Sequence, residues 1–229
     1  MHAKVRINNA GYVSLVDSMG SDLKVVQAAR LSFNKTSDEL DEKDKKLIKY
    51  LGDNKHTSPF RGCMVTLEIQ MPMYIKNQWI KHIIGGEYQF KDTQINEVSR
   101  RYTSEDLAFE WGPEWREQSP DNKQASNEAE FTEQEVNAMD AIYFDLQQHA
   151  MTAYRQLSSL GVAREQARKC LTMATYTKVV WTASLQAVAH FIKLRNHSHA
   201  QAEITEYAQA VETLVSPLYP NAMEALLGD

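Results

Sequence analysis

The stretch "VTLEIQMPMYIKNQWIKHIIGG", Val65 to Gly86, changes its hydrophobic period halfway along. Up to Met71, apolar and polar residues alternate, which is typical of a strand with one buried face. Pro72 then suits the first turn of a helix. The apolar side of that helix is formed by Ile75, Trp79, Ile80 and Ile83. We expect the helix to end at the glycine pair Gly85–Gly86.

Further elements follow on both sides of this stretch. Residues 3–20 predict two short strands around a turn at Asn8–Gly11, and residues 175–183 predict a further strand. Helices are predicted at residues 21–33, 37–54, 164–171, 184–195 and 200–215. A capping box at Thr132–Glu135 opens a long helix that should reach about Ser159. Residues 104–130 are polar and look irregular. Since strands and helices mix without strict alternation, we expect a single α/β or α+β domain over residues 1–229, a mixed sheet packed with helices.

The composition of the 229 residues is that of a soluble globular protein, with 43% hydrophobic and 24% charged residues. The net charge of −5 argues against a general nucleic-acid binder. Cys63 and Cys170 form neither a CxxC pair nor a zinc spacing, so we expect reduced thiols and no metal. The N-terminus has no signal-peptide core and the chain has no membrane-spanning apolar run, which indicates a cytoplasmic protein without a membrane partner.

The segment "INEVSRRYT", Ile95 to Thr103, concentrates positive charge in this acidic chain. The guanidinium groups of Arg100 and Arg101 match phosphate oxygens with paired hydrogen bonds. Beside them, Glu97 and Ser99 can bind the polar edge of a ring or a sugar. A solvated charged turn explains the same residues equally well, so the motif alone leaves both interpretations open.

Other segments carry weaker signals. Gln78, Lys81 and His82 are spaced to share one face of the helix after Pro72, although a solvated face is the simpler explanation. In "LRNHSHAQAE", His199 and Glu203 stand four residues apart, but two ligands without a third make a weak metal site.

Three segments in the same order, "NQWIKH", "NEVSRRY" and "LRNHSHAQAEITEYA", resemble the flavin-dependent thymidylate synthases, the ThyX family. "SDLKVVQAARLSF" and "HTSPF" extend the resemblance over most of the chain. The resemblance implies conversion of dUMP to dTMP, with 5,10-methylenetetrahydrofolate as the one-carbon donor, FAD as the cofactor and NADPH as the reductant. It also implies a mixed α/β domain in a homotetramer, whose active sites form where subunits meet.

Site residues carry over from the same resemblance. Those implied to bind dUMP are Gln78, Lys81, Glu97, Ser99, Arg100, Arg101, Arg168 and Arg195. Those implied to contact FAD are Ser32, His56, Ser58, Lys81, His82, Glu97, Ser184, His190 and His199. Catalytic roles fall to Ser99, Arg195 and His82. We expect Ser99 to orient the substrate rather than attack it, and neither cysteine has an evident base beside it.

The chain also departs from the family pattern. Lys81–His82–Ile83 replaces an arginine–histidine–arginine triplet, Gln186 replaces a further arginine, and residues 85–95 are an insert. We expect weaker FAD binding, or compensation by Lys91. Two alternatives stay open: a flavoenzyme with another product, such as a 5-hydroxymethyl nucleotide, and a non-catalytic nucleotide-binding homologue.

Overall fold

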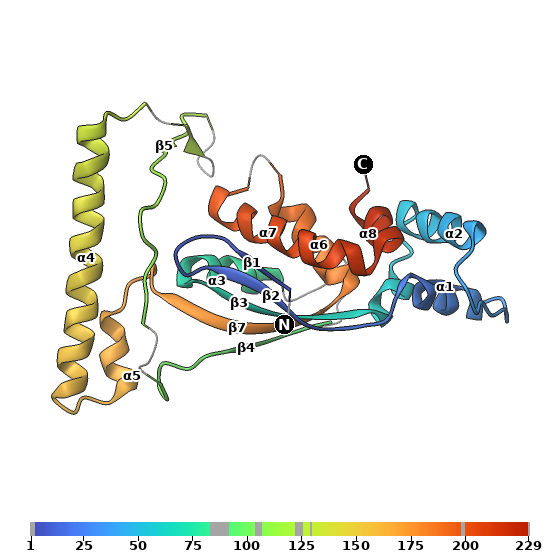
Figure 1. Ribbon diagram of the computed structural model, residues 1–229, viewed down its shortest axis with the longest axis horizontal. Coiled ribbons are helices and arrows are strands. Elements are labelled where there is room, and N and C mark those ends of the chain that lie inside the picture. Colours follow the sequence, from blue (N-terminus) through green and yellow to red (C-terminus); the bar gives the residue numbers. More distant parts are fainter. Residues whose placement is uncertain are drawn as a thin grey trace.

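The computed structural model describes residues 3–82, 92–103, 107–121, 126–128, 130–197 and 200–228. Within them, five antiparallel strands form the main sheet in the order β1-β2-β3-β7-β4 (Figure 1). Their bounds are Lys4–Arg6 (β1), Tyr12–Met19 (β2), Met64–Pro72 (β3), Thr93–Glu97 (β4) and Tyr176–Ser184 (β7). β3 and β7 form the centre and pair along their whole length, from Met64 opposite Ser184 to Pro72 opposite Tyr176.

The alternation predicted for β3 is confirmed. Val65, Leu67, Ile69 and Met71 are at most 1% exposed, whereas the residues between them are half-buried. Successive side chains of a strand point to opposite faces, so one face of β3 forms the core.

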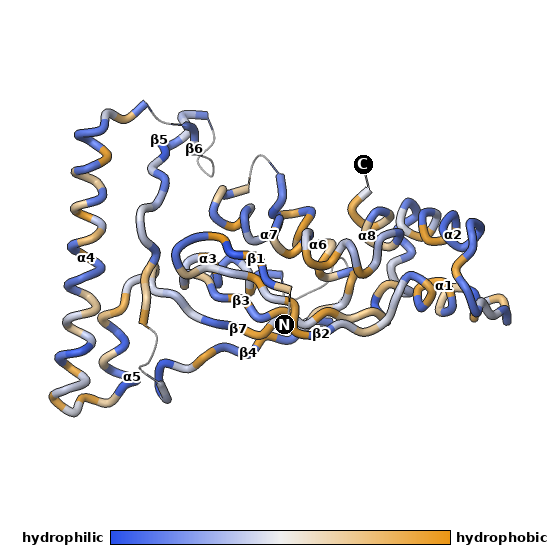
Figure 2. The backbone as a smooth tube through the Cα atoms, in the orientation of Figure 1, coloured by the Kyte–Doolittle hydropathy of each residue, from blue (hydrophilic) through white to orange (hydrophobic). Residues whose placement is uncertain are grey.

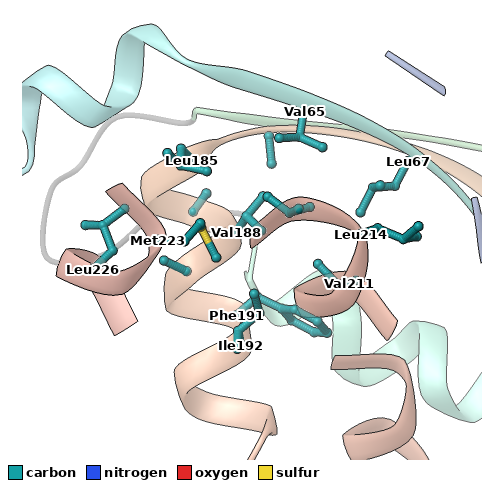
Figure 3. Packing of buried hydrophobic residues seen from close by; sticks show 14 of the residues in the cluster. Val65, Leu67, Leu185, Val188, Phe191, Ile192, Val211, Leu214, Met223 and Leu226 are labelled. Carbon is teal, nitrogen blue, oxygen red and sulfur yellow. The ribbon is translucent and has the colours of Figure 1, made fainter. Parts of the chain in front are cut away.

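Three C-terminal helices cover that face: α6 (Leu185–Arg195), α7 (Ala202–Val215) and α8 (Pro220–Leu227) (Figure 1). Figure 3 shows Val65 and Leu67 of the sheet packed against Val188 and Phe191 of α6 and Val211 of α7. The predicted helices at 184–195 and 200–215 are confirmed within a residue or two.

Helices α1 (Asp22–Leu31) and α2 (Glu42–Asp53) lie at one end of the sheet, beside α8. The buried Asp22 carboxylate accepts hydrogen bonds from the backbone N–H groups of Asn221 and Ala222 and so caps α8. At Gly52, an added Cβ would lie 2.3 Å from the carbonyl oxygen of Ala225, so only glycine fits the crossing of α2 and α8.

The long helix α4 (Glu133–Ser159) stands away from the sheet, together with α5 (Arg164–Ala167) (Figure 1). Its predicted capping box is present between Thr132 and Glu135. Figure 2 shows apolar and polar residues mixed along its length. A two-stranded hairpin, β5 (Glu117–Gln118) and β6 (Ser126–Asn127), precedes it. No helix among the described residues is long and apolar enough to cross a membrane.

Two predictions were wrong in detail. The helix after Pro72, α3 (Met73–Trp79), ends before its expected stop and continues as a 3-10 turn, η2 (Ile80–His82), while Ile83 and the glycine pair lie outside the described residues. No strand was predicted between α3 and residue 104, yet β4 occupies Thr93–Glu97 and overlaps the end of the expected insert at 85–95. The remaining short 3-10 helices are η1 (Ser58–Gly62), η3 (Arg168–Cys170) and η4 (Ser216–Leu218).

Candidate functional site

A cavity of about 620 Å³ opens where β4 ends. Its wall comes from α3, the turn after β4, the segment around η3 and the start of β7. The lining residues are Met73, Lys76, Glu97, Val98, Ser99, Arg100, Arg101, Arg168, Lys169, Leu171, Thr172, Met173, Thr175, Tyr176 and Thr177. The size is that of a typical small-ligand site.

The turn after β4 is fixed by its own backbone. Val98 N–H donates to the carbonyl of Lys178 at 2.9 Å and extends the pairing with β7 by one residue. The carbonyl of Ser99 then accepts from Tyr102 N–H, and the Ser99 hydroxyl accepts from Arg101 N–H at 3.3 Å. These bonds hold Ser99 at the cavity wall and turn the chain sharply enough to bring both neighbouring arginines to it.

Glu97 is held from two sides. The Thr177 hydroxyl donates to Glu97 Oε1 at 2.8 Å, and Lys76 Nζ lies 3.2 Å from Glu97 Oε2. The Lys76 side chain is only 13% exposed, whereas that of Glu97 is 34% exposed. Because Lys76 is mostly withdrawn from water, this pair is worth more than an ion pair on the open surface.

Positive charge dominates the described lining. Arg100 donates to the carbonyl of Tyr176 at 3.2 Å, which fixes its guanidinium at the wall. Arg101 is exposed and its guanidinium carbon lies 5.4 Å from the centre of the Tyr102 ring. Arg168 and Lys169 are exposed on η3. In a chain of net charge −5, this local excess of cations is suited to an anion such as a phosphate.

A second polar cluster lies between η2 and α6. Arg195 Nε–H donates to His82 Nε2 at 2.9 Å, so His82 accepts and is neutral. His82 is 6% exposed, and its ring contacts Phe191 edge-on at 5.3 Å. Burial lowers the pKa of His82 to about 4, with further contributions from the charges of Arg195 and His190. Burial also lowers the pKa of Arg195.

The predicted nucleotide residues therefore divide into two groups. Glu97, Ser99, Arg100, Arg101 and Arg168 share the cavity. Gln78, Lys81 and Arg195 do not line it, and Gln78 instead donates its side-chain amide to Gln201.

The prediction that Gln78, Lys81 and His82 share one face was wrong. His82 is buried whereas Lys81 is exposed. The physical reason is the tightening of the helix after Trp79, since a 3-10 turn advances each side chain further around the axis than an α-helix does.

The predicted flavin residues do not gather in one described cavity. Ser32, His56 and Ser58 are exposed near the ends of α1 and α2, whereas His190 is half-buried on α6. His199 and Lys91 lie outside the described residues.

Ser184 has a structural role in the single chain. It is fully buried, its hydroxyl donates to Asp92 Oδ2, and it accepts from Ala187 N–H as the cap of α6.

One feature of α6 is relevant to flavin binding. Gln186 Oε1 is buried without a hydrogen-bond partner, and His190 follows one turn later on the same side. A buried amide without its partner is costly and suits a ligand that brings polar edges of its own. An isoalloxazine ring has such edges, so Gln186 and His190 fit the ring system of FAD.

Sequence reasoning missed Lys76, Lys169 and Thr177, which all line the cavity. Lys169 could have been found as the neighbour of Arg168. Lys76 and Thr177 offer no local signal, because their role depends on reaching Glu97 from α3 and β7. Among the described residues, no group of three or more His, Cys, Asp or Glu side chains is arranged to hold a metal. Burial raises the pKa of the Cys63 thiol, which makes it a poor nucleophile.

Comparisons with known proteins match nearly the whole length of the chain. A family model described as "Thymidylate synthase complementing protein" matches residues 14–221. A flavin-dependent thymidylate synthase of Thermosipho melanesiensis is 34% identical over 222 residues, 97% of this chain and 93% of that protein. One from Thermus thermophilus is 36% identical, over 96% of this chain and 77% of that protein. The crystal structure of PolB, a UMP/dUMP methylase from Streptomyces cacaoi bound with 5-Br dUMP, matches with a TM-score of 0.81 at 29% identity, covering 96% of both chains.

Proposed function

The chain belongs to the family of flavin-dependent thymidylate synthases, and we propose that it converts dUMP to dTMP. The one-carbon unit comes from 5,10-methylenetetrahydrofolate, the reducing equivalents come from NADPH through FAD, and the reaction takes place in the cytoplasm. The observation that carries the proposal is the cationic cavity at the end of β4, in a chain whose overall charge is negative.

The cavity residues divide the work of binding dUMP. Arg101 and Arg168 are exposed at its wall and bind the 5′-phosphate, where guanidinium groups give paired, charge-assisted hydrogen bonds. The Glu97 carboxylate would repel a phosphate, so it faces a neutral hydrogen-bond donor of the nucleoside. Ser99 orients the nucleotide, because its hydroxyl already accepts from Arg101 N–H and no base contacts it in the described residues.

The reaction requires uracil C5 to attack the one-carbon unit and a hydride to reach the nucleotide. When bound, FAD supplies the hydride. The protein's contribution is to hold the uracil in place, to polarise it with fixed donors and to exclude water. Arg195 is such a donor, and its guanidinium is oriented by the neutral His82.

The α6 side of the protein would hold the flavin. Gln186 and His190 would contact its ring system, and Lys81, an exposed cation, would bind its phosphates. Ser32, His56, Ser58 and His199 complete this set as the resemblance implies. Lysine lacks the planar fork of arginine, so we expect a weaker grip on the phosphates than an arginine gives.

Assembly into a homotetramer explains why the nucleotide residues divide into two groups. In one chain, Arg195 and Gln78 do not line the cavity that holds Arg101 and Arg168. We propose that each complete site combines the cavity of one copy with residues of another.

The test is a product assay with dUMP, methylenetetrahydrofolate, NADPH and added FAD, with the nucleotide identified by mass. We expect a nucleotide heavier by one methylene, which is dTMP. A gain of a methylene plus an oxygen would show a 5-hydroxymethyl product instead. Unchanged dUMP, from folded protein that binds dUMP, would show a nucleotide-binding homologue without the reaction.

Arg101→Ala tests the phosphate site directly. Loss of its charge-assisted bonds should weaken dUMP binding by about 1.5–3 kcal/mol in a calorimetric titration. Arg6→Ala, which removes an exposed arginine from β1 at the opposite edge of the sheet, is the matched control and should bind normally. Unchanged dUMP affinity in Arg101→Ala would remove this arginine from the site.

A further inference from the structure

Lys76 lies at the cavity wall, where its side chain is largely shielded from solvent. It belongs to α3 and stands two residues before Gln78, outside the segments that carry the resemblance to the dUMP-binding motif. Its side chain is 13% exposed and its ammonium lies 3.2 Å from Glu97 Oε2. Lys76 is therefore both a cavity-lining cation and the partner of the carboxylate in the described lining.

The two partners of Glu97 come from different elements. Lys76 approaches one carboxylate oxygen from α3, and the Thr177 hydroxyl approaches the other from β7 at 2.8 Å. Thr177 is 3% exposed, so its hydroxyl is fixed by packing. With one oxygen held from each side, the carboxylate plane cannot rotate freely, and its remaining lone pairs point in set directions.

Without these two partners, the Glu97 side chain would be free to rotate. Glu97 is the last residue of β4, an edge strand of five residues, and its side chain is one-third exposed. A side chain that must find its geometry on binding loses conformational entropy at that moment. A clamp that is already present removes this cost, and it also offsets a negative charge in a cavity meant for an anion.

We propose that Lys76 is a substrate-positioning residue, which together with Thr177 clamps the Glu97 carboxylate so that it accepts a hydrogen bond from a neutral donor of the nucleoside. The donor is the 3′-hydroxyl of the sugar or the N3–H of uracil, both of which offer a proton to a carboxylate oxygen. This inference rests on the proposed function, because it takes the cavity to be the dUMP site.

The experiment compares Lys76→Met, Lys76→Arg, Thr177→Val and wild type by calorimetric titration with dUMP and by steady-state kinetics. Lys76→Met should weaken dUMP binding about tenfold and raise KM to match, since about 1.4 kcal/mol corresponds to a factor of ten. Because the clamp acts on binding, kcat should change less than about threefold. Lys76→Arg keeps a cation and should recover most of the affinity.

Two analogues identify the donor. If Glu97 accepts from the sugar, Lys76→Met and wild type should bind 2′,3′-dideoxyuridine 5′-monophosphate with nearly equal affinity. If it accepts from the base, the same convergence should appear with N3-methyl dUMP. Either result supports the clamp. A tenfold loss that persists with both analogues would overturn it, because Lys76 would then act on the phosphate.

Controls separate the possible failures. Lys46→Met removes an exposed lysine from α2 and should leave dUMP binding and KM unchanged. If Lys76→Met melts early, Thr177→Val provides the second test and should show the same KM effect. Wild-type affinity in both variants would overturn the inference and leave the proposed function standing. A wild-type protein that binds no dUMP would instead overturn the proposed function.

Discussion

The sheet with α6, α7 and α8 buries most of its apolar residues within one chain, whereas α4 buries Met151 and Tyr154 but leaves other apolar side chains exposed. Trp79, Trp181 and Phe191 are at most 2% exposed in the first region, and their rings lie 4.1–5.7 Å apart. On α4, Ile142 is 73% exposed and Leu146 is 57% exposed, one turn apart on one side. The difference teaches that the first region completes its core within one chain, whereas α4 leaves an exposed apolar surface.

Trp79→Ala should have the largest effect on stability. It removes a side chain that packs on Trp181, Phe191 and Tyr207, and it leaves a cavity in the core. We expect the free energy of unfolding to fall by about 3–5 kcal/mol in a denaturant titration.

Trp111→Ala is the matched control in the other region, because Trp111 is 57% exposed. It should cost no more than about 1 kcal/mol. Equal losses in the two tryptophan variants would remove the distinction between the two regions.

The buried His82, in the polar cluster between η2 and α6, provides a test of how the first region responds to pH. Its folded-state pKa of about 4 lies below its unfolded value of about 6.5, so the unfolded chain binds an extra proton between these pH values. Stability from this group is therefore lost as the pH falls from about 6.5 to about 4, by about 2–3 kcal/mol. His190 and Arg195 contribute positive charge nearby.

The measurement is the free energy of unfolding against pH for wild type and His82→Gln. Glutamine keeps a hydrogen-bond acceptor for Arg195 but cannot titrate. The wild type should lose more stability than the variant across this window. Parallel curves would mean that His82 does not contribute to the acid sensitivity.

The smallest effect on chain stability is expected on α4. Ile142→Ser with Leu146→Ser should change the free energy of unfolding of the single chain by about 0.5 kcal/mol or less, because both side chains are already in water. If α4 contacts another copy, the same variant should shift sedimentation velocity toward smaller species. Gln134→Ser with Asn137→Ser, at exposed polar positions of the same helix, is the control. Unchanged assembly in the Ile142/Leu146 variant would place the subunit contact elsewhere.

Elements with local signals were predicted from the sequence. β3 carries its own alternation, and α4 carries its own capping box. β4 was missed because Ile95 is its main apolar residue and its pairing comes from β7. α8 was missed although Pro220 stands in its first turn; the carboxylate that caps it belongs to Asp22, 199 residues earlier in the chain. Strand pairing and caps of this kind become visible only after folding.

The candidate site followed the same division. The cluster from Glu97 to Arg101 was identified because its members are adjacent in the chain and resemble a family motif. The structure brings only part of the predicted set together. Arg168 lines the cavity with this cluster, whereas Arg195 and Gln78 are absent from the described lining. Lys76 could not be found, because pairing with Glu97 requires α3 to lie beside the end of β4.

The two ends of β4 are anchored independently to β7. At one end, Ser184 N–H donates to the carbonyl of Asp92 and the Ser184 hydroxyl donates to its carboxylate. At the other end, Val98 N–H donates to Lys178. A strand that slips by one residue turns every side chain to the opposite face, so these anchors fix the side on which Glu97 appears. Insertions and deletions before Asp92 are thereby insulated from the nucleotide pocket, and the connection from α3 can vary in length during evolution or engineering without changing the register of the site.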